Sequence, residues 1–316
     1  MHNEQRVWLI AGGLAVISLL SLHTGLILSG EPIAQRLNKV IELLSAGKPA
    51  LGIFSQGRSL LNAAALADSD FDFVMIDMEH APLDFERLHA FLLGMVSRRE
   101  VFEKRNLQPN VIPFVRVPHN GREQLQFVIK QVLDLGVYGV MVPHVNTAEE
   151  ALAAVVAARF AQRRGAPDFK PEGQRGFSPG IAARYWGLTV DEYTRRADLW
   201  PLDPQGELLL IVQIEEAQAV RHVEEIINVP GVGAVFIGPA DLSVSMGVKM
   251  DAPEVEDAIQ KILHACLRRG IPCGIPATAG NVAMRIRQGF RFITLGGDLG
   301  IPENAARALR AARGSD

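Results

Sequence analysis

Short apolar runs alternate with longer amphipathic segments along most of the chain. Eight of these runs are rich in Val, Ile, Leu and Phe and are too short for typical helices, which indicates strands buried in a parallel sheet. The runs are Ala50 to Phe54, Phe73 to Asp77, Val111 to Val117, Gly139 to Val142, Leu208 to Ile214, Ala234 to Ile237, Pro272 to Ile275 and Phe292 to Leu295. Eight strands that alternate with helices predict an α/β fold, the closed (β/α)8 TIM barrel.

The segments between the runs carry apolar residues at helical spacing. The helices predicted from them are Leu60 to Ala67, Phe85 to Val96, Gly121 to Leu135, Thr147 to Phe160, Glu216 to Ile227, Pro253 to Arg269, Ala279 to Gln288 and Glu303 to Ala312, with a first helix from about Pro32 to Ala46. The stretch from His144 to Glu207 is longer than the other connections and includes a further helix near Val190 to Asp198. Because long connections in compact domains are usually functional, we expect this stretch to cover the mouth of the barrel.

The N-terminal 30 residues differ from the rest of the chain. No residue from Val7 to Leu28 is charged, and an apolar run of that length can span a bilayer. We therefore divide the chain into a hydrophobic leader, residues 1–30, and a barrel domain, residues 31–316. Weak cleavage-site signals favour a membrane anchor, and a slight excess of basic residues after the run predicts a cytoplasmic barrel. Export through a cleaved signal peptide and a misplaced start codon stay open.

Composition argues against one class of partner and against thiol chemistry. The 316 residues are 48% hydrophobic and 21% charged, which is an ordinary globular balance. A formal charge of -3 and no stripe of Lys and Arg argue against a nucleic-acid partner. Cys266 and Cys273 have no CxxC spacing and no nearby histidine at ligand spacing, so we predict reduced, buried and inert thiols.

Polar residues gather where the predicted strands end, and in a barrel these positions line the active site. Asp77, Glu79 and His80 follow the second strand, Arg116 ends the third, Gln213 and Glu215 end the fifth, and Gly238, Ala240 and Asp241 follow the sixth. Glu215 and Asp241 emerge at the same edge of the sheet and predict a metal site. Without a cluster of Cys or His, two carboxylates favour a hard divalent ion such as Mg²⁺ or Mn²⁺.

The other strand-end residues complete a plausible chemistry. A buried arginine such as Arg116 needs an anionic partner, either a substrate oxygen or a carboxylate of the barrel itself. His80 provides a base that titrates near neutrality, although alone it could simply bond a loop. Metal, cation and base together suit enolate chemistry next to a carbonyl. Asp134 lies near a predicted helix C-terminus, where the helix dipole disfavours an acid, so we expect a positive partner for it.

Four motifs in this order give the chain a family resemblance. They are Ile76 to Pro82, Val115 to Pro118, Val212 to Glu215 and Gly238 to Ser243. From about Leu37 to Arg310 the chain resembles the HpcH/HpaI family of class II, metal-dependent pyruvate aldolases, which includes 4-hydroxy-2-oxoheptanedioate and 2-dehydro-3-deoxyglucarate aldolases. The resemblance implies reversible cleavage of a 4-hydroxy-2-oxo acid to pyruvate and an aldehyde. It also implies homo-oligomers, trimers or hexamers, in which the last helix is exchanged between subunits.

The resemblance further implies a role for each candidate residue. Glu215 and Asp241 would hold Mg²⁺, Mn²⁺ or Co²⁺, and Arg116 would stabilise the enolate. Gln213 would orient groups around the metal, and the amides of Ala240 and Asp241, after Gly238, would receive the pyruvate carboxylate. His80, paired with Asp134 of the same or a neighbouring subunit, would be the acid/base, and Asp77 and Glu79 would order waters nearby.

Three points stay open at the level of sequence. The segments Ser97 to Asn110 and Ala183 to Gly206 look longer than in compact family members, and we expect both to flank the mouth and set the aldehyde specificity. A CoA-ester lyase of the malyl or citryl type is an alternative function, which the Glu79 to Pro82 element disfavours. A membrane-tethered barrel that binds a keto acid without turning it over is another, which the intact set of metal ligands, cation and base disfavours.

Overall fold

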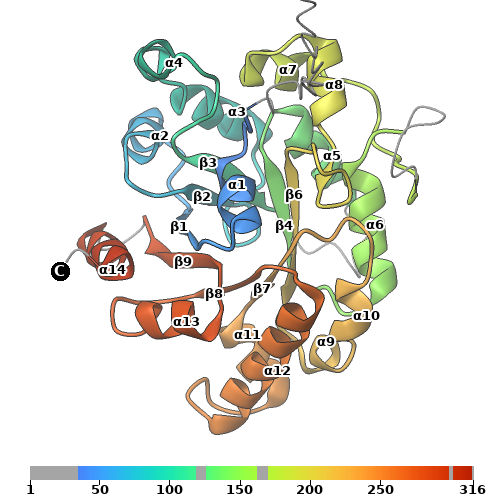
Figure 1. The fold of residues 1–316 in the computed structure, drawn as a ribbon, viewed down its shortest axis with the longest axis vertical. Coiled ribbons are helices and arrows are strands. Elements are labelled where there is room, and N and C mark those ends of the chain that lie inside the picture. The colour runs from blue at the N-terminus through green and yellow to red at the C-terminus, as the bar shows by residue number, and fades with distance from the viewer. Residues whose placement is uncertain (1–34, 119–125, 162–169, 299–301, 315–316) are drawn as a thin grey trace, which may run out of the picture. The chain divides into compact units, whose positions relative to one another are not determined.

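A closed barrel of eight parallel strands forms the centre of the computed structural model, which describes residues 35–118, 126–161, 170–298 and 302–314 (Figure 1). Its strands are β1 (Ala50–Ser55), β2 (Phe73–Asp77), β3 (Ile112–Arg116), β4 (Gly139–Val142), β6 (Leu208–Ile214), β7 (Ala234–Ile237), β8 (Cys273–Pro276) and β9 (Phe292–Gly297). The ring closes where β4 pairs with β6, with Gly139 opposite Leu209. The short strand β5 (Leu199–Trp200) pairs with the first residues of β6. The predicted barrel is confirmed.

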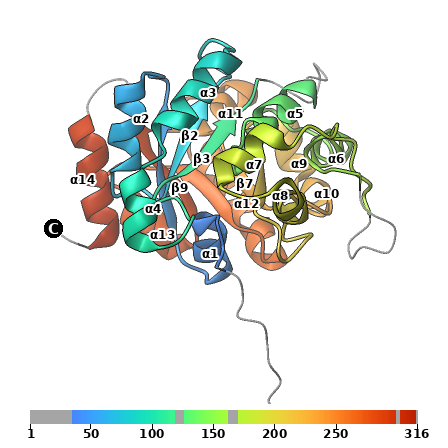
Figure 2. The same ribbon diagram turned by 90° about the horizontal axis from the view of Figure 1, so that it is seen from above.

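Helices surround the strands, as Figures 1 and 2 show. They are α1 (Lys39–Ser45), α2 (Leu60–Ala67), α3 (Phe85–Gly94), α4 (Arg98–Lys104), α5 (Gln126–Asp134), α6 (Ala148–Ala158), α7 (Gly180–Trp186), α8 (Val190–Arg196), α9 (Ala217–Arg221), α10 (Val223–Ile227), α11 (Pro239–Met246), α12 (Pro253–Arg269), α13 (Val282–Gln288) and α14 (Pro302–Arg313). Three of them, α4, α7 and α11, were not predicted. The single helix predicted after Glu215 is divided into α9 and α10 at His222.

Aromatic side chains fill the barrel interior. The rings of Phe73 and Phe292 stack with their centroids 4.2 Å apart, and Phe114 meets both rings edge-on. Glycine makes room for this layer, because a Cβ atom on Gly52 would lie 2.3 Å from the Phe73 ring. Above the layer, Phe236 lies between Phe292 and Phe54. The aromatic layer therefore forms a solid floor beneath the carboxyl ends of the strands.

From α7 onward, the long connection between β4 and β6 packs at the amino end of the barrel, and not over the mouth as predicted. The Trp186 ring, at the end of α7, stacks on Tyr138 with a centroid distance of 4.5 Å, and its Nε1 donates to the Gly136 carbonyl at 2.7 Å. Gly136 and Tyr138 come just before β4, and the Tyr193 hydroxyl of α8 donates to the Leu133 carbonyl. These contacts hold α7 and α8 opposite the carboxyl ends.

The prediction that the two extra segments flank the mouth was also wrong. Parts of the first segment, 97–101 and 107–110, and residues 184–187 of the second contribute to a cavity of about 300 Å³ that reaches Tyr138, at the amino end of β4. Leu107 packs on Gly187, and Gln108 donates to the Arg36 carbonyl before α1. The segments lead into β3 and β6 from their amino ends, and they therefore pack there, against α1 and each other.

Two further predictions concern the chain ends. Residues 1–30 lie outside the described residues, and among the helices that are described none is long and apolar enough to cross a membrane. Helix α14 packs beside β9, with Ala308 and Leu309 buried. Its exchange between subunits stays a prediction.

Cys266 and Cys273 are buried free thiols, as predicted.

Candidate active site

An arginine held by two carboxylates lies where β2 and β3 end. Asp77 and Arg116 are register partners in the two strands, so their side chains leave the sheet side by side. The guanidinium of Arg116 donates to Asp77 through Nε at 3.0 Å and Nη2 at 2.8 Å, and its Nη1 lies 2.9 Å from Glu79 Oε2. Its Cζ lies 4.8 Å from the centre of the Phe54 ring. The anionic partner that sequence predicted for Arg116 is therefore present inside the protein.

The two carboxylates beside Arg116 differ in their electrostatics. Burial alone would raise the pKa of Asp77, but the hydrogen bonds and charge of Arg116 outweigh it and hold that pKa below its ordinary value. Asp77 also accepts the backbone amides of Glu79 and His80 at 3.1 and 3.3 Å, which shapes the turn after β2. For Glu79, burial outweighs Arg116 and raises the pKa. Additional positive charge nearby would therefore stabilise the ionised form of Glu79 more than that of Asp77.

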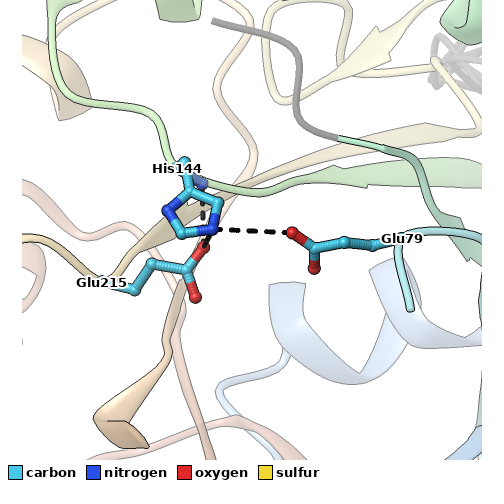
Figure 3. A group of neighbouring side chains, drawn as sticks. All are labelled: Glu79, His144 and Glu215. Carbon is cyan, nitrogen blue, oxygen red and sulfur yellow. Dashed lines mark hydrogen bonds and ion pairs between the residues drawn. The ribbon is translucent and has the colours of Figure 1, made fainter. Parts of the chain in front are cut away.

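Glu215 is a buried carboxylate at the end of β6, with no exposed surface. Burial raises its pKa to about 7, since the nearby His144 offsets only part of the desolvation penalty. Its Oε1 accepts the backbone amide of His144 at 2.8 Å and lies 3.7 Å from Nε2 of the same residue. That Nε2 atom also lies 3.6 Å from Glu79 Oε1 (Figure 3). Glu79, His144 and Glu215 place ligand atoms within 4.8 Å of one another, close enough to hold one metal ion.

Gln213 and Gly238 fix the position of the Glu215 carboxylate from the other side. The Gln213 amide donates to Glu215 Oε2, and its own Oε1 is buried without a hydrogen-bond partner among the described residues. A Cβ atom on Gly238 would lie 2.3 Å from Glu215 Oε2, so only glycine leaves space for the carboxylate there. The orphaned amide oxygen of Gln213 marks a point where a bound group could donate a hydrogen bond.

Asp241 and Ala240 lie in the first turn of α11, directly after β7. Gly238 is the N-cap of this helix and makes no side-chain cap bond, and Pro239 follows it. Asp241 is half-buried, lines the mouth and is close enough to Glu215 for its charge to raise the pKa of that residue. The start of α11 thus adds a second carboxylate and a helix N-terminus, which favours anions, to the same edge of the sheet.

His80 and Asp134 lie at different ends of the barrel. The His80 side chain is 58% exposed at the mouth and its Nε2 lies 3.5 Å from Glu79 Oε2. Asp134 ends α5 at the amino end and pairs with buried Arg175 at 2.7 Å, which is the positive partner expected from its position on the helix. A pair between His80 and Asp134 would have to form between subunits, and it stays a prediction.

The mouth contains a cavity of about 680 Å³ above the aromatic floor. Arg116, Gln213 and Asp241 reach it from the strand ends, beside Phe54 and Phe236. Its outer wall comes from α12, α13, the segments that precede these helices and the ends of β8 and β9. The residues include Met250, Asp251, Val255, Glu256, Ile275, Thr278, Asn281 and Arg285. The cavity has space for a small organic acid, with charged and amide groups both at the strand ends and on the outer wall.

One residue of this site, His144, was missed by the sequence reasoning. It follows β4 by two residues, so it occupies the same kind of strand-end position as Asp77 and Glu215. The position of His144 just after an apolar run, in Val142-Pro143-His144, therefore already indicates a strand-end residue. In the sequence this residue begins a long connection with no second titratable group beside it, and its spatial neighbours Glu79 and Glu215 come from other strands.

Comparison with known proteins agrees with this geometry. The family model described as HpcH/HpaI aldolase/citrate lyase matches residues 50–305. The chain is 32% identical to a 5-keto-4-deoxy-D-glucarate aldolase of Citrobacter koseri, over 87% of this chain and 96% of that protein. It is 36% identical to a hydroxypyruvate/pyruvate aldolase of Delftia acidovorans, over 86% and 93% of the two chains.

A solved structure of the same family also matches this fold. An HpcH/HpaI aldolase/citrate lyase family protein of Burkholderia cenocepacia J2315 superposes with a TM-score of 0.69 at 29% identity, and the match covers 87% of this chain and 99% of that one. The match of the family model and the identity to curated aldolases extend over the whole barrel and the strand ends that carry the site. The chain belongs to the HpcH/HpaI aldolase/citrate lyase family.

Proposed function

We propose that this protein is a divalent-metal-dependent aldolase that cleaves a 4-hydroxy-2-oxo acid to pyruvate and an aldehyde, and catalyses the reverse addition. The observation that carries the proposal is Glu215, a fully buried carboxylate that faces Glu79 and Asp241 beside a cavity lined by Arg116. Two curated relatives named as aldolases, of which this chain covers more than nine-tenths, support the same reaction class.

The residues around Glu215 fit a divalent cation. Burial raises the pKa of Glu215 to about 7, so a positive charge placed next to it would stabilise its ionised form. Gln213 Oε1, which has no hydrogen-bond partner among the described residues, could accept a hydrogen bond from a water or hydroxyl that a bound cation would hold. In this proposal Glu215 and Asp241 hold the ion. A bound cation would act as a Lewis acid that polarises the keto oxygen of the substrate.

The residues of the chain itself bind and orient the keto acid. The Ala240 and Asp241 amides, at the start of α11, would receive the carboxylate, as helix N-termini commonly do. The Arg116 guanidinium would donate to the keto oxygen, where negative charge develops as the carbon–carbon bond breaks. Because Asp77 and Glu79 hold Arg116 on two sides, this donor needs little reorganisation during the reaction.

Proton transfer completes the cleavage. The substrate's 4-hydroxyl loses its proton, the bond between C3 and C4 breaks, and its electron pair moves to C3 and the keto oxygen. C3 then takes a proton to give pyruvate. His80, at the mouth beside Glu79, is proposed to carry these protons, and Asp134 of a neighbouring subunit to orient it.

The test is a screen of 4-hydroxy-2-oxo acids for pyruvate release, measured with a coupled lactate dehydrogenase assay. We expect release that stops in excess EDTA and returns with Mg²⁺, Mn²⁺ or Co²⁺. Full activity in EDTA would contradict the metal proposal. Malyl-CoA in the same screen tests the CoA-ester lyase alternative, and no turnover of any keto acid, together with tight keto-acid binding, would favour a binding protein.

Residues 1–30 are proposed to form a separate leader that anchors the barrel to a membrane and leaves it on the cytoplasmic side. The uncharged run from Val7 to Leu28 supports this reading. Fractionation of cells that express the full chain, or the chain without residues 1–30, tests it. Recovery of both forms in the soluble fraction would contradict an anchor.

A further inference from the structure

The imidazole of His144 faces Glu215, a ligand of the proposed metal site, and its neighbour Glu79. It reaches them from the end of β4, whereas Glu79 follows β2 and Glu215 follows β6, so three separate parts of the barrel converge on one point (Figure 3). Two carboxylates and one imidazole at the carboxyl ends of strands form a donor set that includes nitrogen.

A carboxylate on the far side of the ring sets its tautomer. His144 Nδ1 lies 3.0 Å from Glu216 Oε1, and because a carboxylate only accepts, the hydrogen belongs on Nδ1. Nε2 then carries the lone pair and is the atom that faces Glu79 and Glu215. Metal-ligating histidines commonly donate their other ring nitrogen to a carboxylate in this way.

The distances around Nε2 suit a shared cation better than direct bonding. Nε2 lies 3.6 Å from Glu79 Oε1 and 3.7 Å from Glu215 Oε1, both longer than a normal nitrogen–oxygen hydrogen bond. Ligand atoms about 2.0–2.2 Å from one metal ion are separated by roughly 3–3.6 Å from each other. An ion bound by Nε2 and a glutamate oxygen would therefore need little movement of that pair, whereas all three ligand atoms, which lie within 4.8 Å of one another, would move closer together to share it.

The backbone of His144 is also held in an uncommon conformation. Its φ of 52° lies in the left-handed region, which costs free energy for a residue with a side chain. The amide of the same residue donates to Glu215 Oε1 at 2.8 Å, so the glutamate fixes the backbone that presents the ring. This arrangement orients the imidazole toward the glutamates.

We propose that His144 Nε2 is a direct nitrogen ligand of the divalent metal and biases the site toward Mn²⁺ and Co²⁺ over Mg²⁺. The inference rests on the proposed function, because it concerns the same ion. Imidazole suits transition metals, whereas Mg²⁺ strongly prefers oxygen ligands. Glu215 and Asp241 hold the ion as in the proposed function, His144 adds the nitrogen ligand, and Glu79 lies 3.6 Å from that nitrogen.

The first test is pulsed EPR of the full chain loaded with Mn²⁺ in the absence of substrate. We expect modulation from a directly coordinated ¹⁴N nucleus that disappears in His144→Asn, a residue that tolerates the same left-handed backbone. His222→Asn is the matched control, because His222 lies at the start of α10 with its Nδ1 3.1 Å from the Asn146 carbonyl, and the signal should persist there.

The second readout is calorimetric titration of the same variants with Co²⁺ and Mg²⁺. In His144→Asn we expect Co²⁺ affinity to fall by about tenfold to a hundredfold, with a much smaller change for Mg²⁺. Mn²⁺ that binds the wild type without ¹⁴N coupling, while EDTA-sensitive aldolase activity persists, would overturn this inference and leave the proposed function intact. No binding of Mn²⁺ at all would overturn both.

Discussion

Arg116 combines a structural role at the strand ends with the catalytic role proposed for it. Asp77 and Glu79 occupy three of its nitrogen atoms, and the Phe54 ring covers one face. The requirement for an anion could be predicted from the strand position alone. The identity of that anion could not, because the last residue of β2 and a residue of the turn that follows supply it only once β2 and β3 are in register.

Replacing Arg116 by lysine should therefore damage the reaction more than the fold. Lysine keeps the charge between Asp77 and Glu79 but cannot donate to both and to a substrate with fixed geometry. We expect kcat/KM for pyruvate release to fall by about 10²–10³, with the circular dichroism spectrum unchanged.

Arg99→Lys is the control for this variant. Arg99 is an exposed residue of α4 and pairs only with Glu103 among the described contacts. Its replacement should leave kcat/KM unchanged. Wild-type kinetics in a folded Arg116→Lys protein would remove Arg116 from the proposed mechanism.

Glu215 should make the stabilisation by metal depend on pH. Its folded pKa of about 7 lies above the ordinary value of 4.5, so between these values the metal-free fold binds a proton more readily than the unfolded chain does. The free energy of unfolding of the metal-free protein therefore falls as pH rises through this window, and the loss is complete above it. Because a cation binds the deprotonated form, Mn²⁺ should raise Tm more at about pH 8 than at about pH 5.5.

Thermal melts with and without Mn²⁺ at the two pH values measure this difference. Glu215→Gln, which cannot release a proton, should lose most of both the shift and its pH dependence. An equal rise in Tm at both pH values for the wild type would show that Glu215 does not take up the ion.

At the level of elements, the strands were predictable and several helices were not. The barrel strands are buried on both faces, so each appears as a continuous apolar run with ends correct to within about two residues. Helix α4 has no buried residue, so it shows no apolar face to detect. Helix α7 is only seven residues long and begins at Gly180. Its position at the amino end depends on the contacts of Trp186, which no local pattern indicates.

Truncation of Trp186 tests this placement. The Trp186 side chain is buried, and Trp186→Ala removes both its stack on Tyr138 and its hydrogen bond to the Gly136 carbonyl. We expect the free energy of unfolding to fall by about 3–5 kcal/mol, measured by urea denaturation. KM for the keto acid should not change, because α7 lies at the opposite end from the cavity.

The comparison variant is Phe102→Ala, since Phe102 is 81% exposed on α4. This substitution should change neither the free energy of unfolding nor KM appreciably. A changed KM with unaltered stability in Trp186→Ala would instead place α7 in contact with the substrate.

For the whole molecule, the separation of His80 from Asp134 has a testable consequence. One chain presents His80 at its mouth and Asp134 at its amino end, so the proposed acid/base pair would require two chains. His80→Ala and Asp134→Asn should each be inactive. When the two are mixed after dissociation and reassembly, some sites receive an intact residue from each chain, and activity should return.

Mixing the variants without dissociation provides the control, and light scattering gives the oligomeric state. A monomer that retains full activity would contradict a shared site. Activity in Asp134→Asn alone would assign Asp134 a structural role with Arg175, which is the contact already present within one chain.

Gly238 imposes a constraint that reaches beyond this one chain. The space it leaves is filled by the Glu215 carboxylate, at a distance where no Cβ atom fits. The two positions should therefore change together over evolutionary time. A relative with a larger residue at the position of Gly238 should have replaced the glutamate as well, and its divergence from metal-assisted chemistry should be visible from that pair of positions alone.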